Sequence, residues 1–401
     1  MHYSSLVDRI AGKGCAAWDL HHAARAAQAA GRDILLLTVG DPDLPAPVLA
    51  REAAIQELRT GDARYVETAG QPALRRAIAA LHRRRTGLRD TRPENVVVLA
   101  GAQNALFTAS LCLLGPGDEV LVPEPTYATY PATFGVGGAT VVSTPPARGT
   151  PSLRVDPEAL ARAVTPRTRA IAFANPGNPG GAVLTRAELE AIADIARQHN
   201  LWVVADEVYA DLVYEGEHLS IAALPGMTGR TVTIGSLSKS HAMAGWRVGW
   251  AVGPAGFTEH AERLAQCMLL GLPGFVQTGA VAALEDCGGF AHSLRETYRC
   301  RRDLVVGLLD GAPGLVCHAP QGGMFVLLDA RASGLVAADL AWRLLEEEGV
   351  AVLDAAAFGP SAQGFLRLSL GAAENVLADA CMRISAFAGR HLQGRARQLV
   401  A

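Results

Sequence analysis

Lysine is nearly absent from this 401-residue sequence, although it contains 36 basic residues. Only Lys13 and Lys239 are lysines, and every other basic side chain apart from histidine is an arginine. Arginine stays protonated at any working pH, whereas lysine can lose its proton when it is desolvated or lies beside another cation. A lysine kept in such a composition is therefore a candidate for amine chemistry.

The sequence also lacks the features of several classes of protein. Its net charge is only −3, which gives no sign of nucleic acid or a membrane surface as partner. No apolar run reaches the roughly 18–20 residues that cross a membrane, and the N-terminal stretch has no long apolar segment like that of a secretory signal. The seven cysteines form no CxxC pair and no histidines cluster at metal spacing. We therefore expect reduced thiols, a cytoplasmic protein and no metal site.

Lys239 lies in a short, hydroxyl-rich turn that follows the apolar run at 231–234. Ser236 and Ser238 offer hydroxyls, and Arg247 offers a planar guanidinium that can hold a phosphate dianion. An amine beside a phosphate site indicates pyridoxal phosphate held as a Schiff base, with the lysine later moving a proton. A lone SxSK is more often a solvated surface turn, so this interpretation depends on the rest of the chain.

Short apolar runs alternate with helical patterns over most of the chain. We expect strands at 95–99, 119–122, 169–174, 201–205 and 231–234, and helices that include 47–60, 71–86 and 186–199. This alternation predicts an α/β fold with a wound, mostly parallel sheet, whose ligands gather at the carboxyl ends of the strands. Beyond about residue 290 the pattern predicts a smaller α+β domain. We expect a large domain at 47–290 and a small domain built from 1–46 with 291–401.

The polar residues that follow these strands are of the types that pyridoxal chemistry needs. This chemistry requires an acid at the ring nitrogen, contacts with the ring hydroxyl, donors for the phosphate and a cation for the substrate carboxylate. Asp206 supplies the acid, and Tyr209 and Asn178 the contacts with the ring hydroxyl. The strand-to-helix turn at Ala102 and Gln103 offers backbone N–H groups to a phosphate. Each of these residues could instead have a purely structural role, such as a helix cap for Asp206 or a turn residue for Asn178. The prediction of a pyridoxal phosphate site therefore depends on their order and spacing taken together.

Several segments of the chain together resemble one family: VGDPDLP, YVETAGQPALRRAI, NPGNPGG, DEVY, SLSKSHAMAGWRVG and GFLRLSL. They are similar to the class I and II pyridoxal-phosphate-dependent aminotransferases, which have fold type I, and the resemblance covers essentially the whole chain. It implies that Asn178, Asp206 and Tyr209 hold the cofactor ring, that Lys239 bonds to it and that Arg247 holds its phosphate.

The resemblance also implies roles for five further residues. Tyr127 matches the aromatic ring that stacks on the pyridine, Gly40 the glycine whose backbone touches the substrate carboxylate, and Arg367 the arginine that clamps this carboxylate. Tyr65 matches a tyrosine that reaches the phosphate of the neighbouring subunit, which implies a homodimer with shared active sites. Trp18 falls where some members place an aromatic residue over the substrate.

The stretches AAWD, LLLTVGDPD, VVVLAGAQ, SLSKSHAM and GGMFV are similar to enzymes that move the α-amino group of L-arginine to pyruvate. A guanidinium needs an acidic or aromatic wall, for which Glu67 and Asp19 are candidates; both could equally be surface acids. A related alternative is the aminotransferase of enduracididine biosynthesis, which acts on a 2-oxo acid with a cyclic guanidine.

The predicted reaction is a ping-pong transamination between an amino acid and a 2-oxo acid. The donor amine displaces Lys239 from its imine, and the freed lysine then moves the α-proton. A pyridoxal-phosphate-dependent lyase, a decarboxylase or an arginine oxidase would use the same ring contacts, and a binding protein without turnover is a further alternative. The intact Lys239 argues against the last of these.

Overall fold

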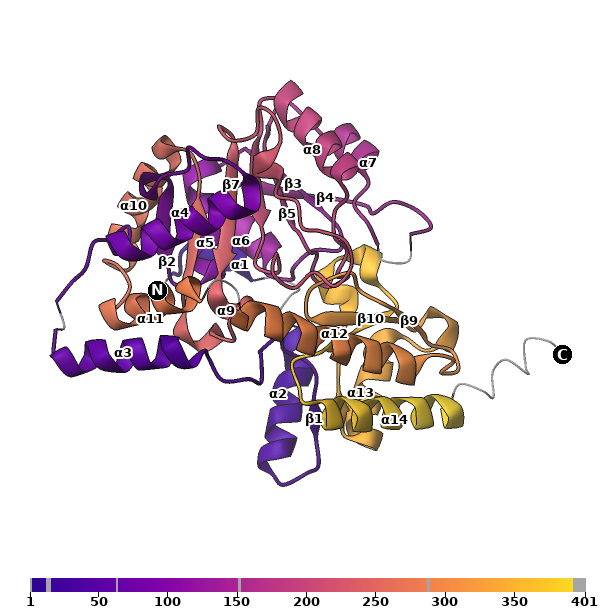
Figure 1. Ribbon diagram of the computed structural model, residues 1–401. Coiled ribbons are helices and arrows are strands. Elements are labelled where there is room, and N and C mark those ends of the chain that lie inside the picture. Colours follow the sequence, from indigo (N-terminus) through magenta and orange to yellow (C-terminus); the bar gives the residue numbers. More distant parts are fainter. Residues whose placement is uncertain (1, 12–15, 63, 151–152, 287–288, 392–401) are drawn as a thin grey trace.

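A seven-stranded sheet forms the centre of the larger part of the molecule (Figure 1). The computed structural model describes residues 2–11, 16–62, 64–150, 153–286 and 289–391. In the order β2-β8-β7-β6-β5-β3-β4, the strands are parallel except β8, which is antiparallel to both neighbours. Their bounds are β2 Val96–Leu99, β3 Glu119–Pro123, β4 Thr140–Thr144, β5 Thr168–Ala174, β6 Trp202–Asp206, β7 Thr231–Ser236 and β8 Gly249–Val252. The predicted α/β fold with a mostly parallel sheet is confirmed.

Helices cover both faces of this sheet, which is why its strands are nearly continuous apolar runs. On one face α5, α6 and α10 pack through a core that includes Leu106 and Phe134. On the other, α3, α4 and α11 form a second core and α7 and α8 a third. The bounds are α3 Val48–Thr60, α4 Pro72–Thr86, α5 Ala102–Leu113, α6 Tyr130–Gly135, α7 Pro157–Arg162, α8 Arg186–Gln198, α9 Leu237–Ser240, α10 Ala255–Met268 and α11 Gly274–Glu285.

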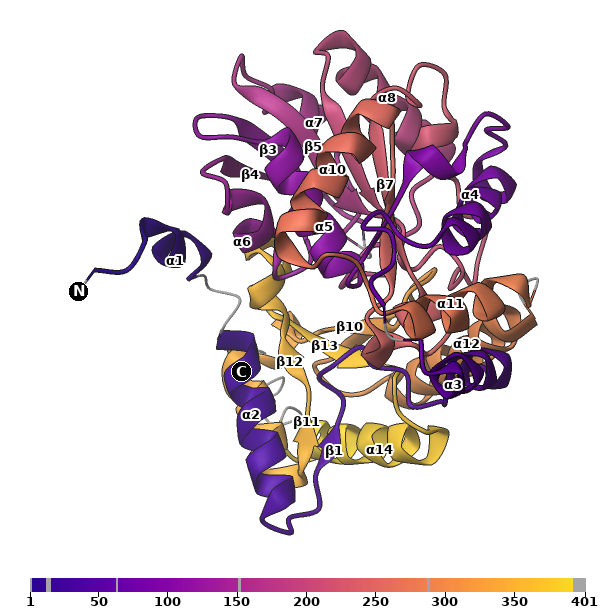
Figure 2. The ribbon, with the colours of Figure 1, turned by 90° about the vertical axis from the view of Figure 1, so that its left-hand side faces the viewer.

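A smaller antiparallel sheet, ordered β12-β13-β10-β9, lies beside the large one and has its own core (Figure 2). That core joins Leu20 and Leu37 from the N-terminal part to Phe387 near the C-terminus. The strands are β9 Val316–His318, β10 Phe325–Asp329, β12 Leu353–Asp354 and β13 Phe365–Ser369, with β1 Leu35–Leu36 parallel to β11 Val350–Ala351. The helices are α2 Ala16–Ala29, α12 Gly289–Leu309, α13 Ala337–Glu348 and α14 Glu374–His391. The exact domain boundaries stay a prediction.

The apolar run at 33–39 of the N-terminal segment forms only the two-residue strand β1, although Leu37 also donates to the carbonyl of Ala351 and accepts from the N–H of Ser369. Helix α1, Ser5–Ile10, lies against α6 of the large sheet, where Arg9 donates to the carbonyl of Val136 at 3.4 Å (Figure 2). Among the described residues, no helix is long and apolar enough to cross a membrane, and no cluster of side chains is suited to a metal ion.

Candidate active site

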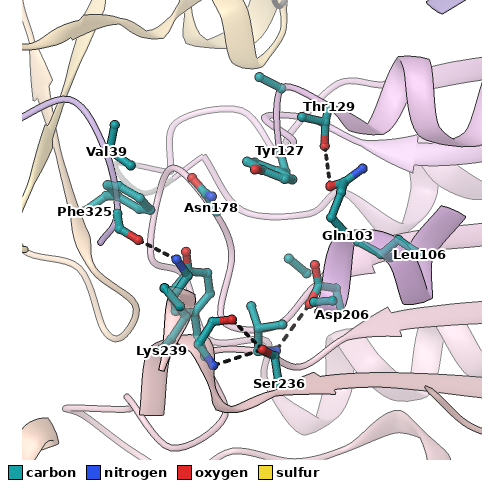
Figure 3. A pocket seen from close by; sticks show the side chains of 18 of the residues that line it. Val39, Gln103, Leu106, Tyr127, Thr129, Asn178, Asp206, Ser236, Lys239 and Phe325 are labelled. Atoms are coloured by element: carbon teal, nitrogen blue, oxygen red, sulfur yellow. Dashed lines mark hydrogen bonds between the residues drawn. The ribbon is translucent and has the colours of Figure 1, made fainter. Parts of the chain in front are cut away.

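A cavity of about 200 Å³ opens at the carboxyl ends of the parallel strands, where the two sheets meet (Figure 3). Its lining draws on both sheets, since β6 and β7 contribute to it together with β10 and β13. Most of the predicted site residues line it: Trp18, Gly40, Ala102, Gln103, Tyr127, Asn178, Asp206, Tyr209, Ser236, Ser238, Lys239, Arg247 and Arg367. Three predicted residues, Asp19, Tyr65 and Glu67, are not in this lining.

Lys239 sits in the single turn α9, directly after β7. The turn begins at Ser236, whose hydroxyl accepts from the backbone N–H of Ser238 at 2.9 Å. The Lys239 Nζ donates to the carbonyl of Gly40. Burial lowers the pKa of Lys239 to about 8, and the positive charges of Arg367 and Arg247 act in the same direction. A fraction of the amine is therefore neutral and nucleophilic near neutral pH.

Asp206 ends β6 and is 5% exposed. Its Oδ2 accepts from the hydroxyl of Tyr130 at 2.8 Å, and its Oδ1 from the backbone N–H of Val208 at 3.3 Å. Burial raises the pKa of Asp206 to about 6, although the Tyr130 hydrogen bond opposes that shift. With a pKa of about 6, this buried carboxyl group is mostly ionised at neutral pH and can pair with a cation in the cavity. Tyr130 was not among the predicted site residues.

The N-terminus of α5 and the side chains after β7 form a group of anion donors. Gly101 caps α5 at a φ of 84° with no side-chain cap, which leaves the first N–H groups of the helix available. Arg247 lies next to them, with its Nη2 donating to the carbonyl of Ala100 at 3.2 Å. A Cβ on Gly101 would come within 2.4 Å of this Nη2, and one on Gly249 within 2.5 Å of the Ala102 nitrogen. The backbone contact leaves no room for a side chain at Gly249, and the positive φ favours glycine at position 101.

Arg367 lies in β13 at the opposite end of the cavity and is only 4% exposed. Its guanidinium is stacked between two aromatic rings, 3.9 Å from the centre of Phe325 and 4.5 Å from that of Phe358. It donates to the Thr38 carbonyl at 2.6 Å and to Asn178 Oδ1 at 3.3 Å. Within the described part of the chain the Nε donor has no partner, although it is buried. A buried cation with a free donor fits an anionic ligand.

Comparisons with known proteins agree with this geometry. Residues 32–384 match the family described as aminotransferase class I and II. The chain belongs to this family. Its predicted fold type I, aminotransferase activity and pyridoxal phosphate cofactor are thereby confirmed, ahead of the lyase, oxidase and non-catalytic alternatives.

The relatives of this aminotransferase are similar along nearly their whole length. The arginine–pyruvate transaminase AruH of Pseudomonas aeruginosa is 52% identical over 385 residues, which cover 96% of this chain and 98% of AruH. An aspartate/prephenate aminotransferase of Cereibacter sphaeroides is 37% identical over 377 residues, covering 91% and 93%. The structure of Thermus thermophilus aspartate aminotransferase with maleate superimposes with a TM-score of 0.90 at 34% identity, covering 96% of this chain and 99% of that one.

The cavity of this aminotransferase fits pyridoxal phosphate by the chemistry of its donors. Donors at the start of α5, the hydroxyls of Ser236 and Ser238, the buried acid Asp206 and the amine of Lys239 all line this one cavity (Figure 3). Tyr127 adds a flat aromatic ring to this lining, held edge-on against Tyr130 at 5.8 Å between ring centres.

Asp19, Tyr65 and Glu67 lie outside this cavity. Asp19 is exposed on α2, although its neighbour Trp18 lines the cavity. Tyr65 is 87% exposed, and Glu67 is exposed on the same loop. The two line a separate open recess. Within one chain, these residues are therefore not brought to the site.

Proposed function

We propose that this aminotransferase moves the α-amino group of L-arginine, or of another amino acid with a guanidinium side chain, to pyruvate. The observation that carries this proposal is the 52% identity, over 96% of the chain, to an enzyme named for arginine and pyruvate. The cavity supports an amino acid as donor, because Arg367 keeps a buried donor free for a carboxylate. A 2-oxo acid with a cyclic guanidine, as in enduracididine biosynthesis, stays the alternative substrate.

Some residues of the cavity would bind the cofactor or the substrate, and others would transfer protons. When bound, pyridoxal phosphate supplies a carbonyl carbon that bonds covalently to an amine and a ring that takes up electrons from the substrate α-carbon. The α5 N-terminus, with Ser236, Ser238 and Arg247, would hold the phosphate, and Asp206 would keep a proton on the ring nitrogen. Asn178 and Tyr209 would contact the ring hydroxyl.

Lys239 would act twice in this arrangement. Its amine would hold the cofactor, and when it is not bonded to the cofactor its neutral Nζ would take the proton from the substrate α-carbon. The lowered pKa of about 8 keeps a useful fraction of Nζ neutral near physiological pH. Arg367 and the backbone of Gly40 would orient the substrate by its carboxylate, so that the α-proton faces Nζ.

We also propose that the enzyme is a homodimer in which Tyr65 and Glu67 enter the partner's cavity. Three apolar side chains of the neighbouring helix α3, Val48, Leu49 and Leu58, are more than half exposed, which favours a partner surface there. Among the described residues, Asp206 is the one carboxylate in the lining of the cavity, so a guanidinium would have to meet its acid from outside this lining. A cytoplasmic location stays a prediction that rests on the scattered spacing of the cysteines in the sequence.

The absorbance of the bound cofactor tests the substrate assignment. We expect it to change on mixing the purified enzyme with L-arginine and to return when pyruvate is added. We further expect Glu67→Gln to lower kcat/KM for arginine by about tenfold, the value of one charge-assisted hydrogen bond, while Asp19→Asn leaves it unchanged. A response to L-aspartate but not to L-arginine would discard the arginine assignment and keep the aminotransferase. An unchanged kcat/KM in Glu67→Gln would discard only the role of Glu67.

A further inference from the structure

Tyr130, the first residue of α6, is held beside the acid of the site. It is 1% exposed, and its hydroxyl donates to Asp206 Oδ2 at 2.8 Å. Burial raises the pKa of Tyr130 well above its usual value, so its hydroxyl keeps its proton and stays a donor. Because Oδ1 has the Val208 N–H and Oδ2 has this phenol, each oxygen of the carboxylate has one donor within the chain.

The ring of Tyr130 is fixed on both sides by aromatic contacts. It meets the ring of Tyr127 edge-on at 5.8 Å and that of Phe134 edge-on at 5.3 Å. Phe134 is fully buried in the core under α5 and α6. The phenol is therefore held in one orientation by packing that does not involve Asp206, so the hydroxyl is set in place for the carboxylate.

Burial alone would favour the neutral form of Asp206, which cannot pair with a protonated ring nitrogen. A hydrogen bond donated to the carboxylate stabilises the charged form and works against that effect. The other titratable groups that face Asp206 are Glu207, which disfavours its charge, Lys239, which favours it, and the phenols of Tyr127 and Tyr209. Among the described residues, Tyr130 is the side chain that forms a hydrogen bond with this acid.

We propose that Tyr130 is a positioning residue that keeps the Asp206 carboxylate ionised and fixes its orientation toward the ring nitrogen of the cofactor. This inference rests on the role of Asp206 in the proposed function. Tyr130 would act only through Asp206, so its effect should depend on the presence of a nitrogen in the ring.

The test is the variant Tyr130→Phe, which removes one oxygen from a packed ring. Equilibrium binding to the apoprotein is measured for pyridoxal phosphate and for an analogue with carbon in place of the ring nitrogen. We expect binding of pyridoxal phosphate to weaken by about tenfold or more, as for loss of a hydrogen bond to a charged group, and binding of the analogue to stay unchanged. The acid limb of the kcat/KM profile should move to higher pH, because the pKa of Asp206 rises.

Two further variants separate this role from simple packing. Phe134→Leu trims the ring on the other side of Tyr130, and we expect it to leave the ratio of the two affinities unchanged. In an Asp206→Asn background, Tyr130→Phe should no longer alter that ratio. The inference is overturned if Tyr130→Phe weakens both ligands equally or neither. If Asp206→Asn alone leaves the ratio unchanged, the proposed role of Asp206 falls and this inference falls with it.

Discussion

The two ends of the cavity differ in how much of their structure one chain supplies. At the cofactor end Asp206 and Ser236 end strands of the large sheet and Lys239 follows one, and all three are held by hydrogen bonds within the chain. At the substrate end Arg367 keeps a donor without a partner in the described residues, and Glu67 lies elsewhere on the surface. We therefore expect the residues of the large sheet to determine the reaction type, and the segments that meet at the substrate end of the cavity to determine the choice of substrate. The two properties should be separable by mutation.

The largest effect should come from the cofactor end. We expect Lys239→Ala to lower kcat by about 10⁴-fold for every amino donor, because the nucleophile and the proton acceptor are lost together. Lys239→Arg is the matched control, since it keeps the positive charge without a usable amine and should lose as much. Steady-state kinetics with two different donors would check this. A loss of kcat that differs strongly between donors would contradict the separation of reaction type from substrate choice.

The next largest effect should come from Arg367. Arg367→Leu removes a buried cation from its carboxylate partner, so kcat/KM should fall by about 10³-fold. Affinity of the apoprotein for pyridoxal phosphate should change far less, because Arg367 touches the proposed ring contacts through one 3.3 Å hydrogen bond, to Asn178. Kinetics and equilibrium binding on the same variant test both statements. An equal loss of cofactor affinity would mean that the two ends are one unit.

A smaller effect should appear in the stability of the apoprotein. The pKa of Asp206 is raised from 3.8 to about 6 in the folded state, so the folded state binds more protons than the unfolded state between these values. Stability should therefore fall as pH rises from about 4 to about 6, by about 3 kcal/mol. Asp206→Asn should remove this slope and be the more stable protein at pH 7. Urea unfolding at several pH values measures it, and an unchanged slope in the variant would contradict the prediction.

Much of the cofactor end could be predicted from the sequence. Buried strands are short apolar runs, and polar residues near their carboxyl ends reach the same sheet edge. Asp206 and Lys239, predicted in this way, line one cavity in the structure. The antiparallel direction of β8 could not be predicted, because an apolar run does not indicate whether its strand is parallel or antiparallel to its neighbours. Its consequence is the contact of Gly249 with the Gly101–Ala102 backbone.

Other features depend on contacts between distant segments. Tyr130 reads as one residue of a loop after Tyr127, and its contact with Asp206 spans 76 positions of sequence. The stacking of Arg367 between Phe325 and Phe358 likewise joins three segments of the smaller sheet region. Tyr65 was predicted from the family resemblance and Glu67 as an acid for a guanidinium, and one chain does not bring either of them to the cavity.

The partly buried Lys239 has a consequence for side reactions. Aldehydes and 2-oxo acids condense reversibly with any accessible primary amine, so a lysine-rich surface would take up such compounds at many unproductive places. This sequence offers a single lysine side chain besides Lys239, and guanidinium groups do not form such adducts readily. Few side-chain amines of this protein therefore compete with Lys239 for an aldehyde, which favours selective labelling of that amine.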